Sequence, residues 1–228
     1  MAGNFANSKV FFLKDVRPLW LDIFKPGQPQ GGGTPKYKVS ALIEKDSENL
    51  EIAKKAMIEA AQGLWGPNAV NVIKSMAANN KALRNGNDKI DDSGAVRPEY
   101  AGKFYISLSN KEKPQVIAQK KHNGKYVTIT EDGRAMVDGM DVTGDIGYPI
   151  TVPYRGCRVN LKCEMVAGKS FKGKDGEIIP NQVFGKIIAV QFVRDDEAFG
   201  AGPTSAEGFE DEEVTAGGGD TLDDDIAF

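Results

Sequence analysis

The stretch Arg158-Val159-Asn160-Leu161-Lys162-Cys163 alternates polar and apolar side chains without interruption. Successive side chains of a β-strand point to opposite faces, so the pattern predicts a strand with Val159, Leu161 and Cys163 in the core. The other three side chains, two of them cations, then face outward together. The stretch therefore predicts a half-buried strand with a basic outer face.

Similar runs on either side of this strand predict a mainly β fold. The run from Val10 to Phe24 is expected to form one long or bent strand, interrupted at Pro18. A loop rich in Gly, Pro and Gln follows, and the strand pattern resumes at residues 36–43. Gly-containing turns join several of the runs, which favours a mostly antiparallel sheet. Further strands are expected at residues 103–109, 115–119, 125–130, 148–154, 157–166 and 182–193.

Two helices are expected between these strands. Ser47 can cap a helix whose apolar positions include Leu50, Ala53 and Met57. A second, short helix is expected over residues 70–77, before a polar stretch. The pattern thus predicts a β-sheet with a helical insertion.

The charges divide the chain into two parts. Residues 195–228 contain twelve Asp and Glu and no Lys or Arg, which leaves 20 acidic residues against 29 basic ones in residues 1–194. The first part therefore carries about +9 and the second about -12. The acidic part also has few residues that can form a core, so we expect it to be disordered when free. We predict one folded domain over residues 1–194 and an acidic tail over residues 195–228.

Several classes of protein are disfavoured. The longest apolar runs fall far short of the roughly 20 residues that cross a bilayer, and the first residues lack a signal-peptide pattern, so a cytoplasmic protein is expected. Cys157 and Cys163 lie about 20 Å apart at strand rise, beyond disulfide reach, and are expected to be buried apolar residues. His122, the one histidine, stands in a polar run typical of a hairpin tip. We therefore expect no enzyme, no metal and no cofactor.

Basic and aromatic residues interleave along several predicted strands. Single-stranded nucleic acid needs positive charge for its phosphates and rings on which its bases stack, whatever its sequence. The combination predicts a single-strand-binding surface, although aromatic rings also pack in cores and lysines also line solvated faces. Strand periodicity leaves Tyr154 beside Arg155, and Tyr105 or Trp20, as stacking candidates. The predicted DNA-binding residues are Trp20, Lys36, Lys38, Tyr105, Lys113, Lys120, Lys121, Lys125, Tyr154, Arg155, Arg158 and Lys162.

These features resemble those of the phage-encoded single-stranded-DNA-binding proteins of the short-tailed coliphage type. The resemblance is carried, in the family's order, by residues 37–43 before a helix, residues 152–154 before a strand, and residues 190–193 leading to residues 198–200. It implies an OB-fold, a five-stranded antiparallel barrel with a helix between strands. It also implies a role in phage DNA replication, recombination and repair.

The C-terminal stretch Asp223-Asp224-Asp225-Ile226-Ala227-Phe228 is similar to the tail ends of bacterial single-stranded-DNA-binding proteins. Those tails finish in an acidic run, Ile, Pro and Phe, and Ala227 stands here in place of the proline. The similarity implies that the tail recruits replication proteins, such as a DNA polymerase, a helicase or primase, or host tail-binding proteins. The predicted contact residues are Asp223, Asp224, Asp225, Ile226 and Phe228.

Two other functions stay open at this stage. An interaction protein could use its acidic tail to mimic nucleic acid, dock that tail on its own basic face and bind no DNA. A nuclease could hold a divalent metal with scattered carboxylates such as Asp138, Asp141 and Asp145. The main prediction is a phage protein that coats single-stranded DNA in the cytoplasm of its bacterial host, with a homodimer left open.

Overall fold

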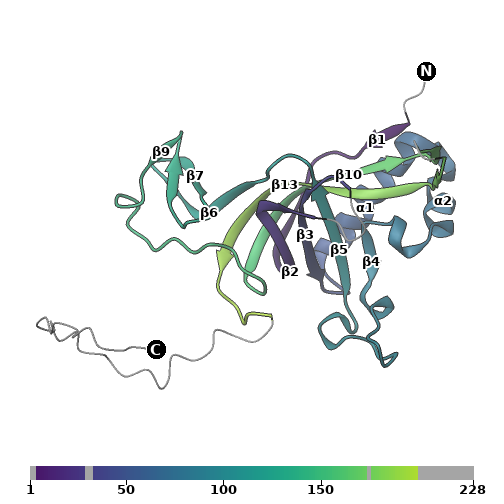
Figure 1. The fold of residues 1–228 in the computed structure, drawn as a ribbon, viewed down its shortest axis with the longest axis horizontal. Coiled ribbons are helices and arrows are strands. Elements are labelled where there is room, and N and C mark those ends of the chain that lie inside the picture. Colours follow the sequence, from purple (N-terminus) through teal and green to yellow (C-terminus); the bar gives the residue numbers. More distant parts are fainter. Residues whose placement is uncertain (1–3, 29–32, 174–175, 200–228) are drawn as a thin grey trace, which may run out of the picture.

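Five strands close into a barrel in the computed structural model, which describes residues 4–28, 33–173 and 176–199 (Figure 1). Around the ring, β2 pairs with β3, β3 with β5, β5 with β13, β13 with β10, and β10 again with β2. Their bounds are Phe11–Gly27 for β2, Lys36–Ile43 for β3, Phe104–Asn110 for β5, Arg158–Gly168 for β10 and Gln182–Arg194 for β13. The predicted five-stranded barrel is confirmed, and it is closed.

One seam of the barrel, between β5 and β13, is parallel, whereas the other four are antiparallel. Strand direction cannot alternate all the way around a closed ring with an odd number of strands, so one neighbouring pair must run the same way. Four of the five seams are antiparallel, which confirms the predicted mostly antiparallel sheet.

The alternation that predicted β10 holds in the structure. Val159, Leu161 and Cys163 are fully buried, and Arg158 and Lys162 are partly exposed on the outer face. Both cysteines are free and buried, as expected. Because the pattern has the period of a strand, one face of β10 supplies the core and the other stays available for polar contacts.

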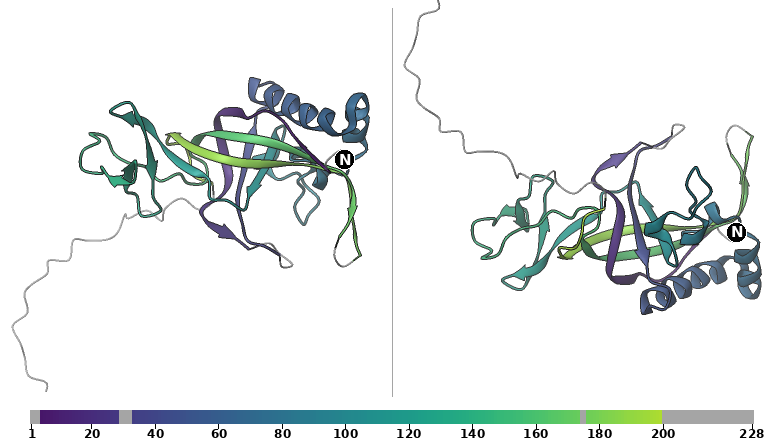
Figure 2. Two further views of the ribbon diagram at one scale, coloured as in Figure 1. Left: turned by 90° about the horizontal axis from the view of Figure 1, so that it is seen from above. Right: turned by 90° about the horizontal axis from the view of Figure 1, so that it is seen from below.

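Helix α1 (Glu48–Trp65) begins at the predicted cap, where the Ser47 hydroxyl oxygen accepts a hydrogen bond from the Leu50 N–H. It lies between β3 and β5 in the chain and packs against one side of the barrel (Figure 2). After a 3-10 turn at Gly66–Asn68 the second expected helix, α2 (Ala69–Ser75), follows. Neither α-helix in the described part of the chain has both the length and the apolar character that a membrane crossing requires.

The polar stretch after α2 is ordered against the barrel. It contains 3-10 turns at Ala78–Asn80, Gly86–Asp88 and Pro98–Tyr100, and the short strand β4 (Leu83–Asn85), which pairs with β5. This stretch adds a wall to the barrel's outer face.

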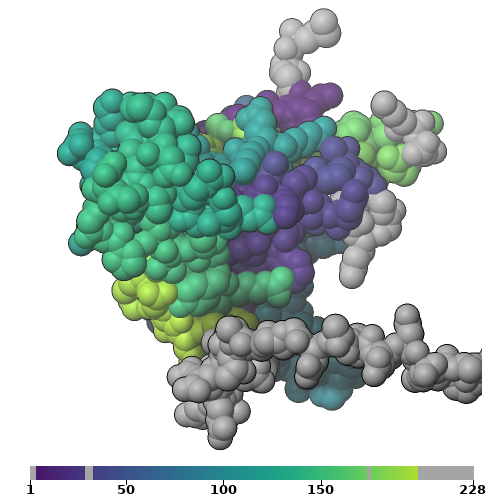
Figure 3. Space-filling view, turned by 60° about the vertical axis from the view of Figure 1, so that its left-hand side comes forward, coloured from purple at the N-terminus to yellow at the C-terminus, as the bar shows by residue number. Residues whose placement is uncertain are grey.

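An arm extends the sheet beyond β13. It consists of β6 (Gln115–His122), β7 (Lys125–Ile129), β8 (Ala135–Val137) and β9 (Met140–Asp141), at the opposite end of the molecule from α2 (Figure 1). Figure 3 shows the side chains of the arm in teal at the front of the molecule. The turn between β6 and β7 is Asn123-Gly124, and both residues have positive φ, as a tight two-residue hairpin requires. The hairpin tip expected around His122 is confirmed.

Two short elements flank the barrel. Strand β1 (Phe5–Asn7) pairs with the end of β10, and β11 (Phe171–Lys172) pairs with β12 (Ile178–Ile179) in a hairpin between β10 and β13. Figure 2 shows that the ends of β2 and β3 and the β11–β12 hairpin project from the same side of the barrel, opposite α1.

The structure corrects two sequence expectations. Residues 148–154 form no strand, because Pro149 and Pro153 lack the N–H group that a ladder needs. Pro18 does not interrupt β2; it pairs with Ala41, and the pairing register shifts just after it. The proline is accommodated as a local irregularity within one long strand.

Candidate nucleic-acid interface

A groove of about 860 Å³ crosses the outer face of β2, β3, β5 and the start of β13. The inward side chains of these strands fill the core, so short polar side chains of β3 and β5 form much of its floor: Ser40, Ser107 and Ser109. Residues 79–89 make one wall, and the end of β2 makes the other. We call this surface the main groove.

Positive charge predominates in the main groove. Its described lining includes Lys38, Lys81, Arg84 and Lys89, and a single carboxylate, that of Asp22. Arg84 is held in place because its Nε donates to the Lys81 carbonyl at 2.7 Å and its Nη2 to the Asn79 carbonyl at 3.1 Å. The groove therefore presents four cations to an anionic ligand, and hydrogen bonds fix the orientation of Arg84.

Trp20 stands at the wall of the main groove with 44% of its surface exposed. Its Nε1 donates to Asp22 Oδ2 at 2.7 Å, which orients the indole. The guanidinium of Arg155 lies over the ring, with Cζ 4.0 Å from its centre. The structure thus brings two predicted residues from distant segments together as an aromatic and cationic pair.

Tyr105, a predicted stacking residue, is covered. It is 4% exposed, and the Tyr100 ring packs edge-on against it with centroids 5.2 Å apart. The cations Arg84 and Lys89 lie within 6 Å of its ring. Tyr105 therefore supports the basic wall from beneath, and its ring is not open to a base.

Tyr154 makes structural contacts in place of the expected open ring. Its hydroxyl donates to the Asp196 carbonyl at 2.8 Å and accepts from the Asp196 N–H at 3.1 Å. Burial of the ring raises the pKa of the phenol. Tyr154 thereby holds the segment that follows β13.

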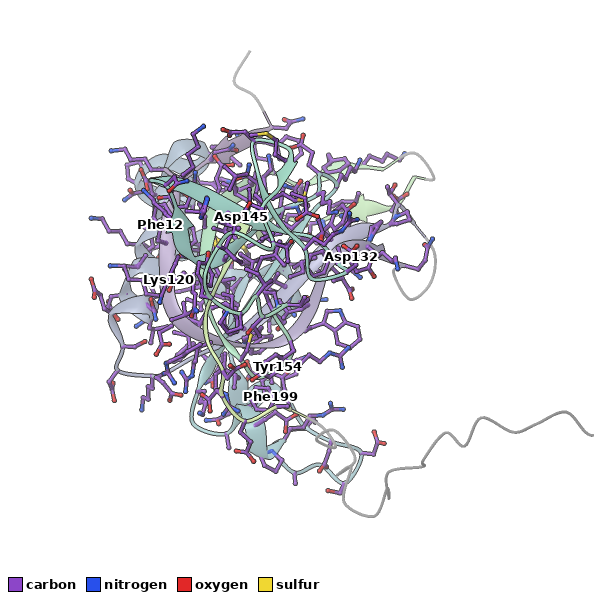
Figure 4. The ribbon with its side chains drawn as sticks, turned by 90° about the vertical axis from the view of Figure 1, so that its left-hand side faces the viewer. Phe12, Lys120, Asp132, Asp145, Tyr154 and Phe199 are labelled. Atoms are coloured by element: carbon purple, nitrogen blue, oxygen red, sulfur yellow. The ribbon has the colours of Figure 1, made fainter. Side chains whose placement is uncertain are left out.

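Residues 195–199 pack on the barrel, although the sequence pattern assigned them to the tail. We call these five residues the strap. Asp196 bonds Arg158 at 2.6 Å and lies 3.7 Å from Arg17. The hydrogen bond from Arg158 lowers the pKa of the Asp196 carboxyl to about 2. Arg17 also covers the Phe199 ring at 4.1 Å. Figure 4 shows Tyr154 and Phe199 at the same end of the molecule.

The strap explains the position of Arg158, which the sequence placed on a DNA-binding strand. Its guanidinium is engaged by Asp196 and also donates to the Asp15 carbonyl at 3.1 Å. Gly156 lets the strap approach closely, because a Cβ there would lie 2.3 Å from the Glu197 carbonyl oxygen. Arg158 therefore joins the strap to the barrel and lies outside the lining of the main groove.

The remaining predicted lysines divide among four places. Lys36 lies in a second cavity beside the main groove, described below. Lys162 stands on β10 with Nζ 6.0 Å from the Phe12 ring centre, and Lys113 is 5.9 Å from that of Phe24. The arm holds the others: Lys121 lies 4.4 Å from the Tyr126 ring centre, Lys120 lies 5.7 Å from that of Tyr148, and Lys125 is paired with Asp138.

Sequence reasoning missed Lys81, Arg84 and Lys89, and the exposed Phe184 of β13. The three cations occur in a polar stretch without strand periodicity, which reads as a surface loop. Their spacing over nine residues was the available signal.

Two of the three carboxylates proposed for a nuclease form contacts with neighbouring side chains. Asp138 pairs with Lys125, and Asp141 accepts from the Thr143 hydroxyl at 2.6 Å. Within residues 4–28, 33–173 and 176–199, no three His, Cys, Asp or Glu side chains gather in a way that could hold a metal ion. The tail-tip residues Asp223, Asp224, Asp225, Ile226 and Phe228 lie outside the described residues.

The sequence matches one family model and one known phage protein. A model of the family described as Enterobacter phage Enc34, ssDNA-binding protein, matches residues 9–218. The protein p50 of Acyrthosiphon pisum secondary endosymbiont phage 1 is 33% identical over 204 residues, which cover 87% of this chain and 91% of p50.

Two solved structures match the chain. The single-stranded DNA-binding protein from bacteriophage Enc34 in complex with ssDNA has a TM-score of 0.52 and 19% identity, over 84% of this chain and 89% of that chain. The gp2.5 single-stranded DNA-binding protein of bacteriophage T7 has a TM-score of 0.46 and 12% identity, over 92% of this chain and 100% of that chain. The family model spans most of the sequence, and the family that it describes is not enzymatic. The protein therefore belongs to the family of phage single-stranded-DNA-binding proteins that includes the Enc34 protein.

Proposed function

We propose that the main groove binds single-stranded DNA without regard to sequence and that the protein coats such strands during phage DNA replication, recombination and repair. The proposal rests on one observation: four cations and the exposed ring of Trp20 line the same groove. Cations attract any phosphate and a ring accepts any base, so neither contact reads sequence. The infected bacterium's cytoplasm is where such strands arise.

Shape also favours a single strand. The main groove lies across a barrel face, where the OB-fold presents its strands to an extended chain. Its serine floor offers small side chains, so a backbone can approach closely, and unpaired bases can reach Trp20. A duplex keeps its bases stacked on one another and cannot use the ring in this way.

Titration of labelled single-stranded and duplex oligonucleotides, with and without magnesium, tests the function. We expect tight binding of the single strand, weaker binding of the duplex and no cleavage. Failure to bind even after removal of the acidic tail would support the nucleic-acid mimic, and magnesium-dependent cleavage would support the nuclease. The mass of the free protein by light scattering decides between a monomer and a homodimer.

We further propose that the acidic tail recruits replication proteins. Its twelve negative charges end in an apolar tip with Phe228 as the last residue. A buried aromatic anchor surrounded by charge pairs is a common way to bind a partner's pocket. The partner classes are a DNA polymerase, a helicase or primase, or a host tail-binding protein.

Removing Phe228 alone separates this contact from DNA binding. The variant keeps every charge, so its DNA affinity should match that of the full chain, whereas capture of a purified polymerase, helicase or tail-binding protein should be lost. If the full chain and the variant lacking Phe228 capture the partner equally well, Phe228 is not the anchor of this contact.

A further inference from the structure

A second cavity, of about 560 Å³, adjoins the main groove. Ser109, Gln182 and Phe184 line both cavities, so one surface continues into the other. A strand that leaves the main groove at Phe184 therefore enters the second cavity next.

Three phenylalanines from separate segments line this cavity. Phe5 comes from β1, Phe171 from β11 and Phe184 from β13, and they are 53%, 37% and 37% exposed. Phe5 lies against Gly168, where an added Cβ would come within 3.1 Å of the ring. Single exposed apolar side chains are ordinary, but three around one cavity indicate a binding site. We call it the phenylalanine pocket.

Three lysines, Lys36, Lys111 and Lys186, complete the rim of the phenylalanine pocket. Its described lining contains no carboxylate, and none of these lysines forms an ion pair within the part of the chain that the structure describes. Their ammonium groups are thus available to an anionic ligand.

Unpaired bases need flat apolar rings, and the phosphates between them need cations. We infer that the phenylalanine pocket is a second subsite for the DNA strand held in the main groove, where further nucleotides stack on Phe5 and Phe171. The inference rests on the proposed function of the main groove. Continuity of the two surfaces favours the same strand over a separate protein ligand.

The β11–β12 hairpin supplies a matched pair of variants. Phe171 is paired with Ile179 and Lys172 with Ile178, so Phe171 and Ile178 lie on opposite faces of the hairpin. Ile178 is 78% exposed and lies outside the pocket lining. Phe171→Ala therefore tests the pocket, and Ile178→Ala controls for any change in the hairpin.

The experiment measures the affinity of oligothymidylates of increasing length by fluorescence anisotropy for the full-length protein and both variants. On the shortest strands that bind, Phe171→Ala should equal the wild type. On longer strands it should bind about 5-fold or more weakly, the effect of losing one stacked base. Ile178→Ala should follow the wild type at every length.

Lys111→Ala is an independent test. It should lower the salt dependence of affinity for long strands, and the salt dependence for short strands should not change. The inference is overturned if Phe171→Ala and Ile178→Ala behave alike at all lengths while short strands bind normally. It is also overturned if Phe171→Ala changes the mass of the free protein, which would make the pocket a contact between copies. If the wild-type protein binds no short strand, the proposed function of the main groove is refuted instead.

Discussion

Arg155 lies over the indole of Trp20, with its guanidinium carbon 4.0 Å from the ring centre. Trp20 belongs to β2, and Arg155 to the loop that precedes β10. The carbonyl of Arg155 also accepts the Phe199 N–H at 3.1 Å. One residue thus contacts both the wall of the main groove and the strap.

Trp20→Ala should weaken single-strand binding by about 1–3 kcal/mol, because it removes a stacking ring and leaves the cations in place. Fluorescence anisotropy with a labelled oligonucleotide measures the loss. DNA should also quench the fluorescence of Trp20. A Trp65→Phe variant should keep that quenching, since Trp65 packs against the core from α1. Unchanged affinity in Trp20→Ala would show that bases stack elsewhere.

Lys38→Ala should lower the slope of log affinity against log salt by about 0.7, the effect of one phosphate contact to a single strand. Lys162→Ala is the matched control, because Lys162 also lies on the outside of a barrel strand but stands on β10 over Phe12. Its slope should equal the wild-type slope. The reverse result would mean that DNA follows β10, as the sequence pattern alone suggested.

Tyr154→Phe should lower the free energy of unfolding by about 0.5–1.5 kcal/mol, since the hydroxyl bonds the Asp196 backbone. DNA affinity should not change. Urea denaturation measures the first effect and anisotropy the second. Tyr126→Phe is the control, because Tyr126 is 60% exposed on the arm. If the variant instead loses DNA affinity and keeps its stability, Tyr154 contacts DNA, as the sequence pattern predicted.

Acid should weaken the strap through Asp196. Its pKa is lowered from 3.8 to about 2 by the hydrogen bond from Arg158, so the folded protein favours the charged form. A carboxylate with a depressed pKa stabilises the fold above its unfolded pKa and loses that contribution as pH falls through the folded value. The Tm difference between wild type and Asp196→Asn should therefore be largest near neutral pH and shrink as pH falls from about 4 towards about 2. If the Tm difference stays constant over this range, Asp196 is not the source of the pH-dependent stability.

Truncation after Phe199 should tighten single-strand binding, most strongly at low salt. It removes nine of the twelve tail carboxylates and keeps the strap. Those nine charges are expected to compete with DNA for the cations of the main groove. A tail of equal length with those nine residues changed to Asn or Gln should tighten binding to the same extent. If only the truncation does so, bulk rather than charge is responsible.

Much of the fold could be predicted because its signals are local. The alternation in β10, the cap at Ser47 and the hairpin at Asn123-Gly124 each depend on residues within a few positions of one another. The expected strand at residues 148–154 does not form, because Pro149 and Pro153 cannot donate the hydrogen bonds of a ladder even though the apolar residues alternate.

The composition of the candidate site depended on contacts across the barrel. Arg158 and Lys162 face outward, as their strand period requires, but the strap engages the first, and neither lines the main groove. Pairing of β3 and β4 with β5 instead places Lys38 and Trp20 in one groove with Lys81, Arg84 and Lys89. In the chain, helices α1 and α2 separate these two groups of residues. Periodicity reveals which side of a strand a residue occupies, whereas only the pairing of distant strands decides which of those sides form one surface.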